Sequence, residues 1–122
     1  SVGEESGEIP YTCYYATKDY IAKNPQTIQK FTNAIAKGQT WVKEHSAEEV
    51  ATCMLGFFPD TNKEILTKVT QRHKDIDAFM ETPVLKEEAF ARLQEVMLKA
   101  GVIKEKADFS KIVDNSFAEK VK

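Results

Sequence analysis

One segment near the N-terminus constrains the fold of this chain more than any other. Residues 9–16, IPYTCYYA, are rich in tyrosine, threonine and cysteine, which favour extended structure, and none of them is charged. A strand here would alternate its side chains between two uncharged faces, and such strands are usually covered on both sides in α/β proteins. We therefore predict an N-terminal strand at residues 9–16 whose partner strands lie outside this sequence.

The rest of the chain has the periodicity and the end signals of helices. Helix starts are indicated by Asn24-Pro25 and by capping boxes at Ser46–Glu49 and Thr61–Glu64. The first three predicted helices are Thr17–Lys23, one from Asn24-Pro25 to about His45, and one from Ser46 to a stop at Phe57-Phe58-Pro59. The fourth begins at Thr61 and becomes less regular before Thr82-Pro83. The last two are Lys86–Ala100 and a helix carrying Phe117 and Val121.

The helix over residues 86–100 has the most regular apolar stripe, and Gly101 suits the left-handed residue that ends many helices. A short turn is predicted beyond it, around residues 109–112. The predicted fold class is therefore mainly α, with five or six helices plus one N-terminal strand. These elements form a single domain over residues 9–122, which follows a loop over residues 1–8.

The composition is that of an ordinary soluble domain, and it excludes some classes of function. With 122 residues the chain is long enough for one domain with its own core. The 17 basic and 19 acidic residues leave no surplus of positive charge for binding nucleic acid. No apolar run is long enough to span a bilayer. The first residues, SVGEESGEI, lack an initiator Met and a signal peptide, as in a processed mature terminus or a piece of a longer chain.

Residues with catalytic chemistry are few. His45 and His73 are the only histidines, and each falls late in a predicted helix, where a structural role is expected. Cys13 and Cys53 lack metal-ligand spacing; a disulfide between them stays open, and two separately buried free thiols are expected. No motif for catalysis, nucleotide binding or metal binding is present. The sequence therefore predicts no catalytic residue, no metal and no cofactor.

The aromatic segment is the best candidate for contact with a small molecule. Tyr11 and Tyr14 offer ring faces and hydroxyl groups, and Thr12 adds a further hydroxyl. A strand at the edge of an α/β sheet is a usual place for a ligand. We predict ligand contacts for Tyr11, Thr12 and Tyr14. The alternative is that these tyrosines pack beneath the helices.

Several signals in a fixed order resemble a known family. They are Pro10-Tyr11 in the strand, Asn24-Pro25, a helix with Phe31, Ala34 and Trp41, the Ser46-Ala-Glu-Glu corner, Phe58-Pro59-Asp60, Thr82-Pro83 and Ala100-Gly101. From about residue 8 to residue 118 the chain resembles the C-terminal part of substrate-binding proteins of ABC transporters. The nearest group handles nitrate, sulfonates, taurine and thiamine pyrimidine precursors. Leu85 and His73 depart from the family's pattern, which affects local detail only.

The resemblance implies a two-lobed α/β fold of the periplasmic-binding-protein type II kind, of which this chain would be a fragment. Residues 9–16 would be the strand that returns to the first lobe, and residues 1–8 would lie near the hinge. The implied function is the solute-binding component of an ABC-type importer for a small anionic or heterocyclic solute. The implied partner is an ABC permease, and the implied location is extracytoplasmic, with an anchor or signal upstream.

Two other functions are compatible with the same resemblance. Pyrimidine-precursor synthases that use pyridoxal phosphate share the domain, although the lysine and histidine of their site would lie upstream of this chain. A sensory or interaction module could also carry it, although the ending AEKVK resembles a natural chain end. An isolated chain with an uncovered strand is further expected to form a homodimer through residues 9–16.

Overall fold

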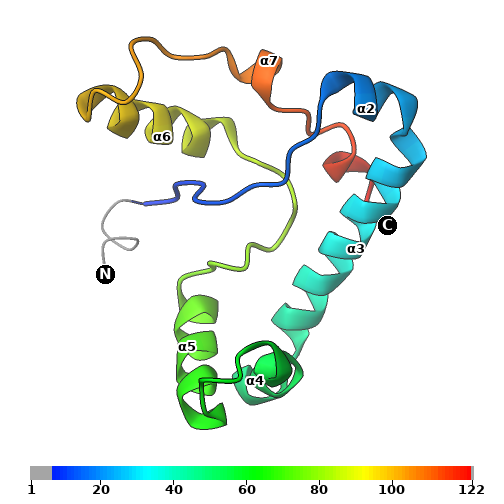
Figure 1. The fold of residues 1–122 in the computed structure, drawn as a ribbon, viewed down its shortest axis with the longest axis vertical. Helices are drawn as coiled ribbons and strands as arrows, with labels where there is room; N and C mark the ends of the chain where they lie inside the picture. The colour runs from blue at the N-terminus through cyan, green and yellow to red at the C-terminus, as the bar shows by residue number, and fades with distance from the viewer. Residues whose placement is uncertain (1–6, 122) are drawn as a thin grey trace. The chain divides into compact units, whose positions relative to one another are not determined.

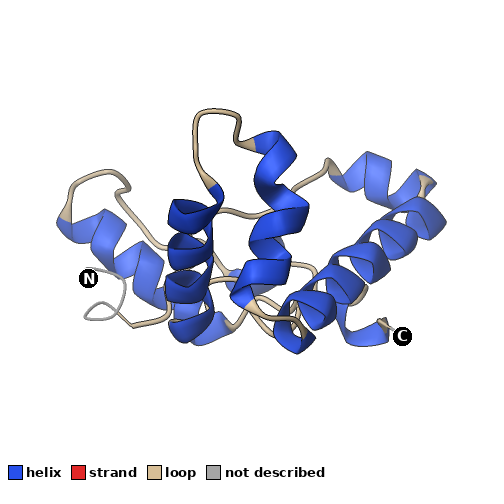
Figure 2. Ribbon diagram, turned by 90° about the horizontal axis from the view of Figure 1, so that it is seen from below, coloured by secondary structure: helices blue, strands red, loops and turns tan. Residues whose placement is uncertain are grey.

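The computed structural model describes residues 7–121. This part of the chain contains six α-helices and two 3-10 turns, and no residue in it belongs to a strand (Figure 2). The mainly α prediction is therefore confirmed. The elements are α2 (Lys18–Lys23), α3 (Pro25–Glu44), α4 (Ala47–Met54), η1 (Leu55–Phe57), α5 (Lys63–Asp75), α6 (Glu87–Lys99), α7 (Phe109–Ile112) and η2 (Ala118–Lys120).

The strand predicted at residues 9–16 is wrong for this structure. The backbone there has no regular secondary structure (Figure 1). Residues 11–16 are all exposed. The physical reason is that a strand needs a neighbour to pair its backbone groups, and residues 17–121 supply only helices and loops. The predicted loop over residues 1–8 lies outside the described residues, except for Gly7 and Glu8.

The chain divides into two compact units. One unit comprises the residues up to Thr32 together with those from Val84 onward, and the other comprises Asn33–Pro83. The boundary falls inside α3. The single domain over residues 9–122 stays a prediction, and the two units are described separately below.

In the unit of residues 33–83, the start of α4 follows the predicted capping box. The backbone N–H of Glu49 donates to Ser46 Oγ at 3.2 Å, and the backbone N–H of Ser46 donates to Glu49 Oε2 at 2.8 Å. The start of α5 differs from the prediction by one residue. The cap is Asn62, whose Oδ1 accepts from the N–H of Ile65 at 2.9 Å, because Thr61 lies one residue too far from the first turn.

Helices α4 and α5 pack against each other and form the core of this unit (Figure 1). Ala47, Val50 and Ala51 of α4 are buried, as are Leu66 and Thr70 of α5. These positions recur every three to four residues, so each short helix turns one stripe of buried residues toward its partner. The hairpin is therefore held by its own side chains rather than by helix propensity alone.

The predicted continuation of the fourth helix toward Thr82-Pro83 is also wrong. Helix α5 ends at Asp75, and Asp77 and Met80 have left-handed backbones with φ of 50° and 60°. A left-handed residue cannot continue a right-handed helix, so the helix ends before these two positions. Residues other than glycine adopt this conformation rarely.

Lys74, on the last turn of α5, ties this helix to the end of α3. Its Nζ donates to the carbonyl of Val42, and to that of His45 at 2.7 Å. The last carbonyls of a helix have no partner within it, and a lysine is a suitable donor to them. One side chain therefore satisfies the end of α3 and fixes the end of α5.

In the other unit, α6 confirms the predicted helix and its stop. Ala100 is the C-cap, and Gly101 has a φ of 70°. The N–H of Val102 donates to the carbonyl of Met97 at 2.9 Å, and that of Gly101 donates to Leu98 at 3.0 Å. These two bonds define the Schellman motif, which requires the left-handed residue that glycine adopts without strain.

Two side-chain amides hold the loops of this unit in place of a sheet. Gln94 Nε2 donates to the carbonyl of Ala107 at 3.2 Å, and the N–H of Ala107 donates back to Gln94 Oε1. Asn115 makes the same two-way pairing with the backbone of Leu85, at 2.9 and 3.1 Å. Each amide thus pairs with both the N–H and the C=O of one residue, as a neighbouring strand would.

The C-terminal segment differs partly from the prediction. The turn around residues 109–112 is confirmed as α7, but the last helix is only the 3-10 turn η2. Gln29 Nε2 donates to the carbonyl of Phe117 at 2.9 Å, which pins this segment to α3. This side-chain hydrogen bond holds the chain at Phe117, directly before η2, where the sequence predicts a longer helix.

Candidate functional site

The aromatic segment, which we define as residues 9–16, is anchored on both sides within its unit. Before it, the carboxylate of Glu8 pairs with Lys86 at 2.6 Å, and Arg92 Nη1 donates to the carbonyl of Glu8 at 2.7 Å. After it, Thr17 caps α2, and its hydroxyl oxygen accepts from the N–H of Tyr20 at 3.2 Å. The segment is therefore an open stretch between two fixed ends (Figure 1).

The backbone at the residue before Glu8 favours a glycine. Gly7 has a φ of 70°, and a Cβ at this position would lie 3.1 Å from Arg92 Nη1. Both the backbone conformation and the space beside the guanidinium group therefore favour a residue without a side chain. This close approach lets Arg92 reach the backbone carbonyl of Glu8.

Tyr14 is the one predicted ligand residue with a ring contact in the structure. Its ring meets that of Phe31 on α3 edge to face, with centroids 4.9 Å apart and planes at 80°. Tyr14 is still 74% exposed and Phe31 is 46% exposed. No local pattern in the sequence indicates this pairing of Tyr14 with Phe31. The pair presents an aromatic surface to which a flat ligand can stack.

Tyr11 and Thr12 are exposed, Tyr11 almost completely at 98%. The alternative in which the tyrosines pack beneath the helices is therefore wrong for this structure, which also leaves Tyr15 at 93% exposure. The three predicted ligand residues share one segment but do not line a described hollow. Ligand contact by Tyr11, Thr12 and Tyr14 stays a prediction.

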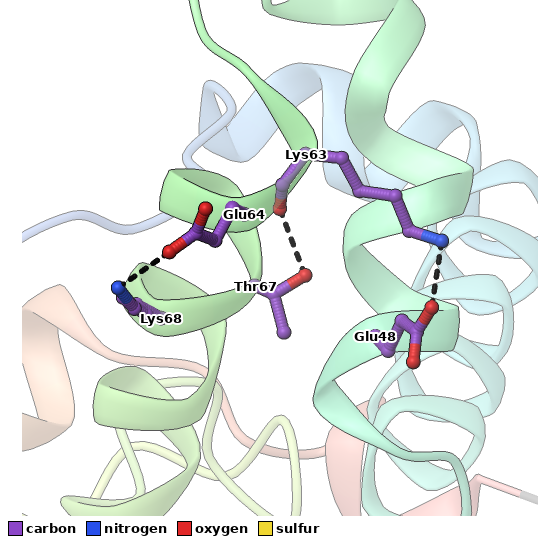
Figure 3. Close-up of a pocket in the computed structure, with 5 residues that line it drawn as sticks. All are labelled: Glu48, Lys63, Glu64, Thr67 and Lys68. Atoms are coloured by element: carbon purple, nitrogen blue, oxygen red, sulfur yellow. Dashed lines mark hydrogen bonds and ion pairs between the residues drawn. The ribbon is translucent and has the colours of Figure 1, made fainter.

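A hollow of about 470 Å³ lies between α4 and α5 in the other unit (Figure 3). Its charged groups already have partners. Lys63 pairs with Glu48 at 2.7 Å, Lys68 pairs with Glu64 at 2.8 Å, and the hydroxyl of Thr67 donates to the carbonyl of Lys63. Because these ion pairs are exposed, each contributes less than about 1 kcal/mol. The charged groups around this hollow therefore brace α4 and α5 with weak surface ion pairs, and none of the predicted ligand residues lines it.

Several ionisable groups on the surface have pKa values that local contacts shift. The hydroxyl of Ser46 donates to Glu49 and lowers the pKa of that carboxyl. Lys106 lowers the pKa of Glu95, and Glu81 raises that of Lys43. Hydrogen bonding explains each of these shifts, so none marks a catalytic group.

Histidines and cysteines were the other candidates for chemistry. His45 hydrogen-bonds through Nδ1 to the carbonyl of Trp41 at 2.7 Å, and its ring stacks on that of Trp41 at 4.2 Å. His73 Nδ1 lies 2.8 Å from the carbonyl of Val69. Cys13 and Cys53 are free thiols, but both are exposed, so their predicted burial is wrong. Within residues 7–121 no group of acidic, histidine and cysteine side chains could hold a metal ion.

No helix in the described part of the chain is both long and apolar enough to cross a membrane.

Comparison with known proteins links the chain to binding proteins. Residues 4–49 match the family described as "NMT1/THI5 like". Over 121 residues, or 99% of the chain, the sequence is 37% identical to "Putative binding protein YtlA" of Bacillus subtilis (strain 168). The chain spans 36% of the length of that relative. No solved structure matches the chain. The aromatic segment lies within residues 4–49, the part of the chain that matches this family, and the chain is similar along its length to a protein named for binding.

Proposed function

We propose that this chain is the C-terminal part of the solute-binding component of an ABC-type importer. The observation that carries the proposal is the 37% identity, over 99% of the chain, to a relative named as a binding protein. The solute would be small and either anionic or heterocyclic, such as nitrate, a sulfonate, taurine or a thiamine precursor. This solute class follows from the resemblance described for the sequence, and the family match covers residues 4–49, which include the aromatic segment.

In this proposal the chain binds rather than catalyses. The name of the relative supports a binding role, and each histidine has a structural contact in its own unit. Residues 9–122 would belong to one lobe of the receptor, with residues 1–8 near the hinge. An ABC permease would be the partner, and the protein would work outside the cytoplasm.

Tyr11, Thr12 and Tyr14 are the residues that we propose for solute contact. Exposed rings and hydroxyls of this kind can stack on a heterocycle and donate hydrogen bonds to an anion. The edge-to-face contact with Phe31 would hold Tyr14 in place during binding. The segment is also tied at both ends by Glu8 and Thr17, which limits its loss of freedom when a ligand binds.

The proposal is tested by thermal unfolding of the natural gene product that contains this sequence, with nitrate, taurine, an alkanesulfonate and an aminopyrimidine as separate ligands. A ligand at about 100 times its Kd stabilises the folded protein by about 2.7 kcal/mol, so one solute class should raise the melting temperature clearly. No shift with any of the four would contradict the proposed solute class.

The residues are tested by titration of the solute that binds. Tyr11→Ala and Tyr14→Ala should each weaken binding about tenfold, as expected for the loss of one stacked ring. Tyr20→Ala is the matched control, because Tyr20 is exposed in the same unit but lies on α2. Unchanged affinity in both test variants would reject the site while leaving the function standing.

A further inference from the structure

The turn that follows α5 has an unfavourable backbone. Asp77 and Met80, with φ of 50° and 60°, are the two residues other than glycine that have a positive φ in the part of the chain that the structure describes. The N–H of Met80 donates to the carbonyl of Asp77 at 3.1 Å and closes a tight turn around Ala78 and Phe79. Left-handed residues with side chains are costly, and they occur often in segments that switch between conformations.

Helix α3 holds this turn through one side-chain amide that is only half used. Gln39 Nε2 donates to the carbonyl of Phe79 at 3.3 Å. Gln39 Oε1 is buried and accepts from no group among residues 7–121. A buried acceptor without a donor is unfavourable, because it has lost its hydrogen bonds to water. A group from outside this unit cannot supply the donor, since the oxygen is already shut off from the surface.

The other two amides that hold loops show what a complete pairing looks like. Gln94 and Asn115 each bond to both the N–H and the C=O of one residue. The N–H of Phe79, the residue that Gln39 holds, has no backbone acceptor. In an extended backbone both groups of one residue point the same way, whereas a turn directs them apart. The turn around Phe79 therefore prevents the second bond to Gln39.

We propose that residues 76–81 form a strap with two arrangements on α3. In the arrangement described above, the turn is closed and Gln39 makes one bond. In the other, the turn opens, Phe79 becomes extended, and its N–H donates to Gln39 Oε1. One exposed backbone bond is exchanged for one that satisfies a buried acceptor, and Asp77 and Met80 leave the left-handed region. Because the gains and losses are of similar size, both arrangements are populated.

The strap links three parts of its unit. The ring of Phe79 lies 5.8 Å from that of His73 on α5, and Glu81 pairs at 2.6 Å with Lys43, which is one turn beyond Gln39 on α3. The unit ends at Pro83, directly after the strap. The change at Phe79 therefore alters the path by which the chain leaves this unit. This inference stands apart from solute binding, which is measured by a different assay.

Relaxation dispersion of amide nitrogens tests the exchange directly. The measurement uses the natural gene product that contains this sequence, with ¹⁵N-labelled phenylalanine and methionine. The signals of Phe79 and Met80 should show exchange on the microsecond-to-millisecond timescale, since the two arrangements differ in the bonds of both N–H groups. Flat profiles at both positions, as for a single arrangement with a fixed buried water at Gln39, would overturn the proposal.

The role of the Gln39 oxygen is tested by Gln39→Met, which removes the acceptor and keeps an unbranched side chain. The exchange at Phe79 and Met80 should disappear, because the second arrangement loses its new bond. Gln71→Met is the matched control, since Gln71 lies on α5 in the same unit, is exposed, and bonds to Asp75. Exchange that persists unchanged in Gln39→Met would overturn the proposed partner.

The role of the backbone is tested by Met80→Gly. Glycine adopts the left-handed region without cost, so this variant favours the closed turn and should lower the population of the second arrangement about tenfold. Ala78→Gly is the control, because Ala78 lies in the same turn without a positive φ. It should change the population less than about threefold. Equal effects of the two glycines would contradict the exchange that we propose.

Discussion

The α4–α5 hairpin and the aromatic segment represent two opposite ways of using apolar residues. The hairpin buries Val50, Ala51 and Leu66 between two short, capped helices. The aromatic segment exposes Tyr11 and Tyr15 almost completely. The hairpin buries its apolar residues within itself, because α4 and α5 follow each other closely along the chain. The aromatic segment is incomplete because an extended backbone needs hydrogen-bonding partners that local sequence does not supply.

The largest expected effect comes from removing a core side chain of the hairpin. Leu66→Ala should lower the free energy of unfolding by about 3 kcal/mol, since it leaves a cavity between α4 and α5. Its neighbour Ile65, on the same helix, is 52% exposed, so Ile65→Ala should cost less than about 1 kcal/mol. Urea unfolding followed by circular dichroism measures both. Equal losses would show that the hairpin is not packed as described.

A smaller effect is expected from the lysine that joins α5 to the end of α3. Lys74→Met removes the donor to the carbonyls of Val42 and His45, and should cost about 1.5 kcal/mol. Lys68→Met is the control, because its exposed pair with Glu64 contributes only about 0.3 kcal/mol. Similar unfolding midpoints for the two variants would contradict the bridging role of Lys74.

The smallest effect on stability is expected from removing the cap at the start of α4. Ser46→Ala removes the cap and should lower stability by about 1 kcal/mol. The hydroxyl of Ser46 lowers the pKa of Glu49 below its ordinary value of 4.5. A lowered folded-state pKa stabilises the protein fully above pH 4.5, and this contribution is lost as the pH falls through the lowered value.

The pH dependence of unfolding separates the two parts of this capping effect. Ser46→Ala should reduce the loss of stability below pH 4.5, because the carboxyl of Glu49 then titrates at a similar pH in both states. Glu49→Gln, which has no titrating carboxyl, is the control and should remove the same pH dependence. An unchanged pH profile in both variants would show that the capping box does not carry the effect.

The features that the sequence predicted well are those determined by a few neighbouring residues. The box at Ser46–Glu49 and the stop at Gly101 depend on side chains within one helical turn. The start of α5 was misplaced by one residue because Thr61 and Asn62 are both good caps. Local patterns could not decide between them.

The features that the sequence missed depend on residues far apart along the chain. The contact of Tyr14 with Phe31 joins a loop to a helix, and the pairing of Asn115 with Leu85 spans 30 positions. The strand at residues 9–16 failed for the same reason, since its propensity is high but no partner is present among the described residues. Ligand contact by Tyr11, Thr12 and Tyr14 likewise depends on a molecule that local sequence patterns do not describe.

Hydrogen exchange measured by mass spectrometry tests the central comparison most directly. The amides of α4 and α5 should be protected, because their partners are internal. The amides of residues 9–16 should exchange freely, because the backbone there forms no helix or strand. Protection of residues 9–16 equal to that of α4 and α5 would contradict the account.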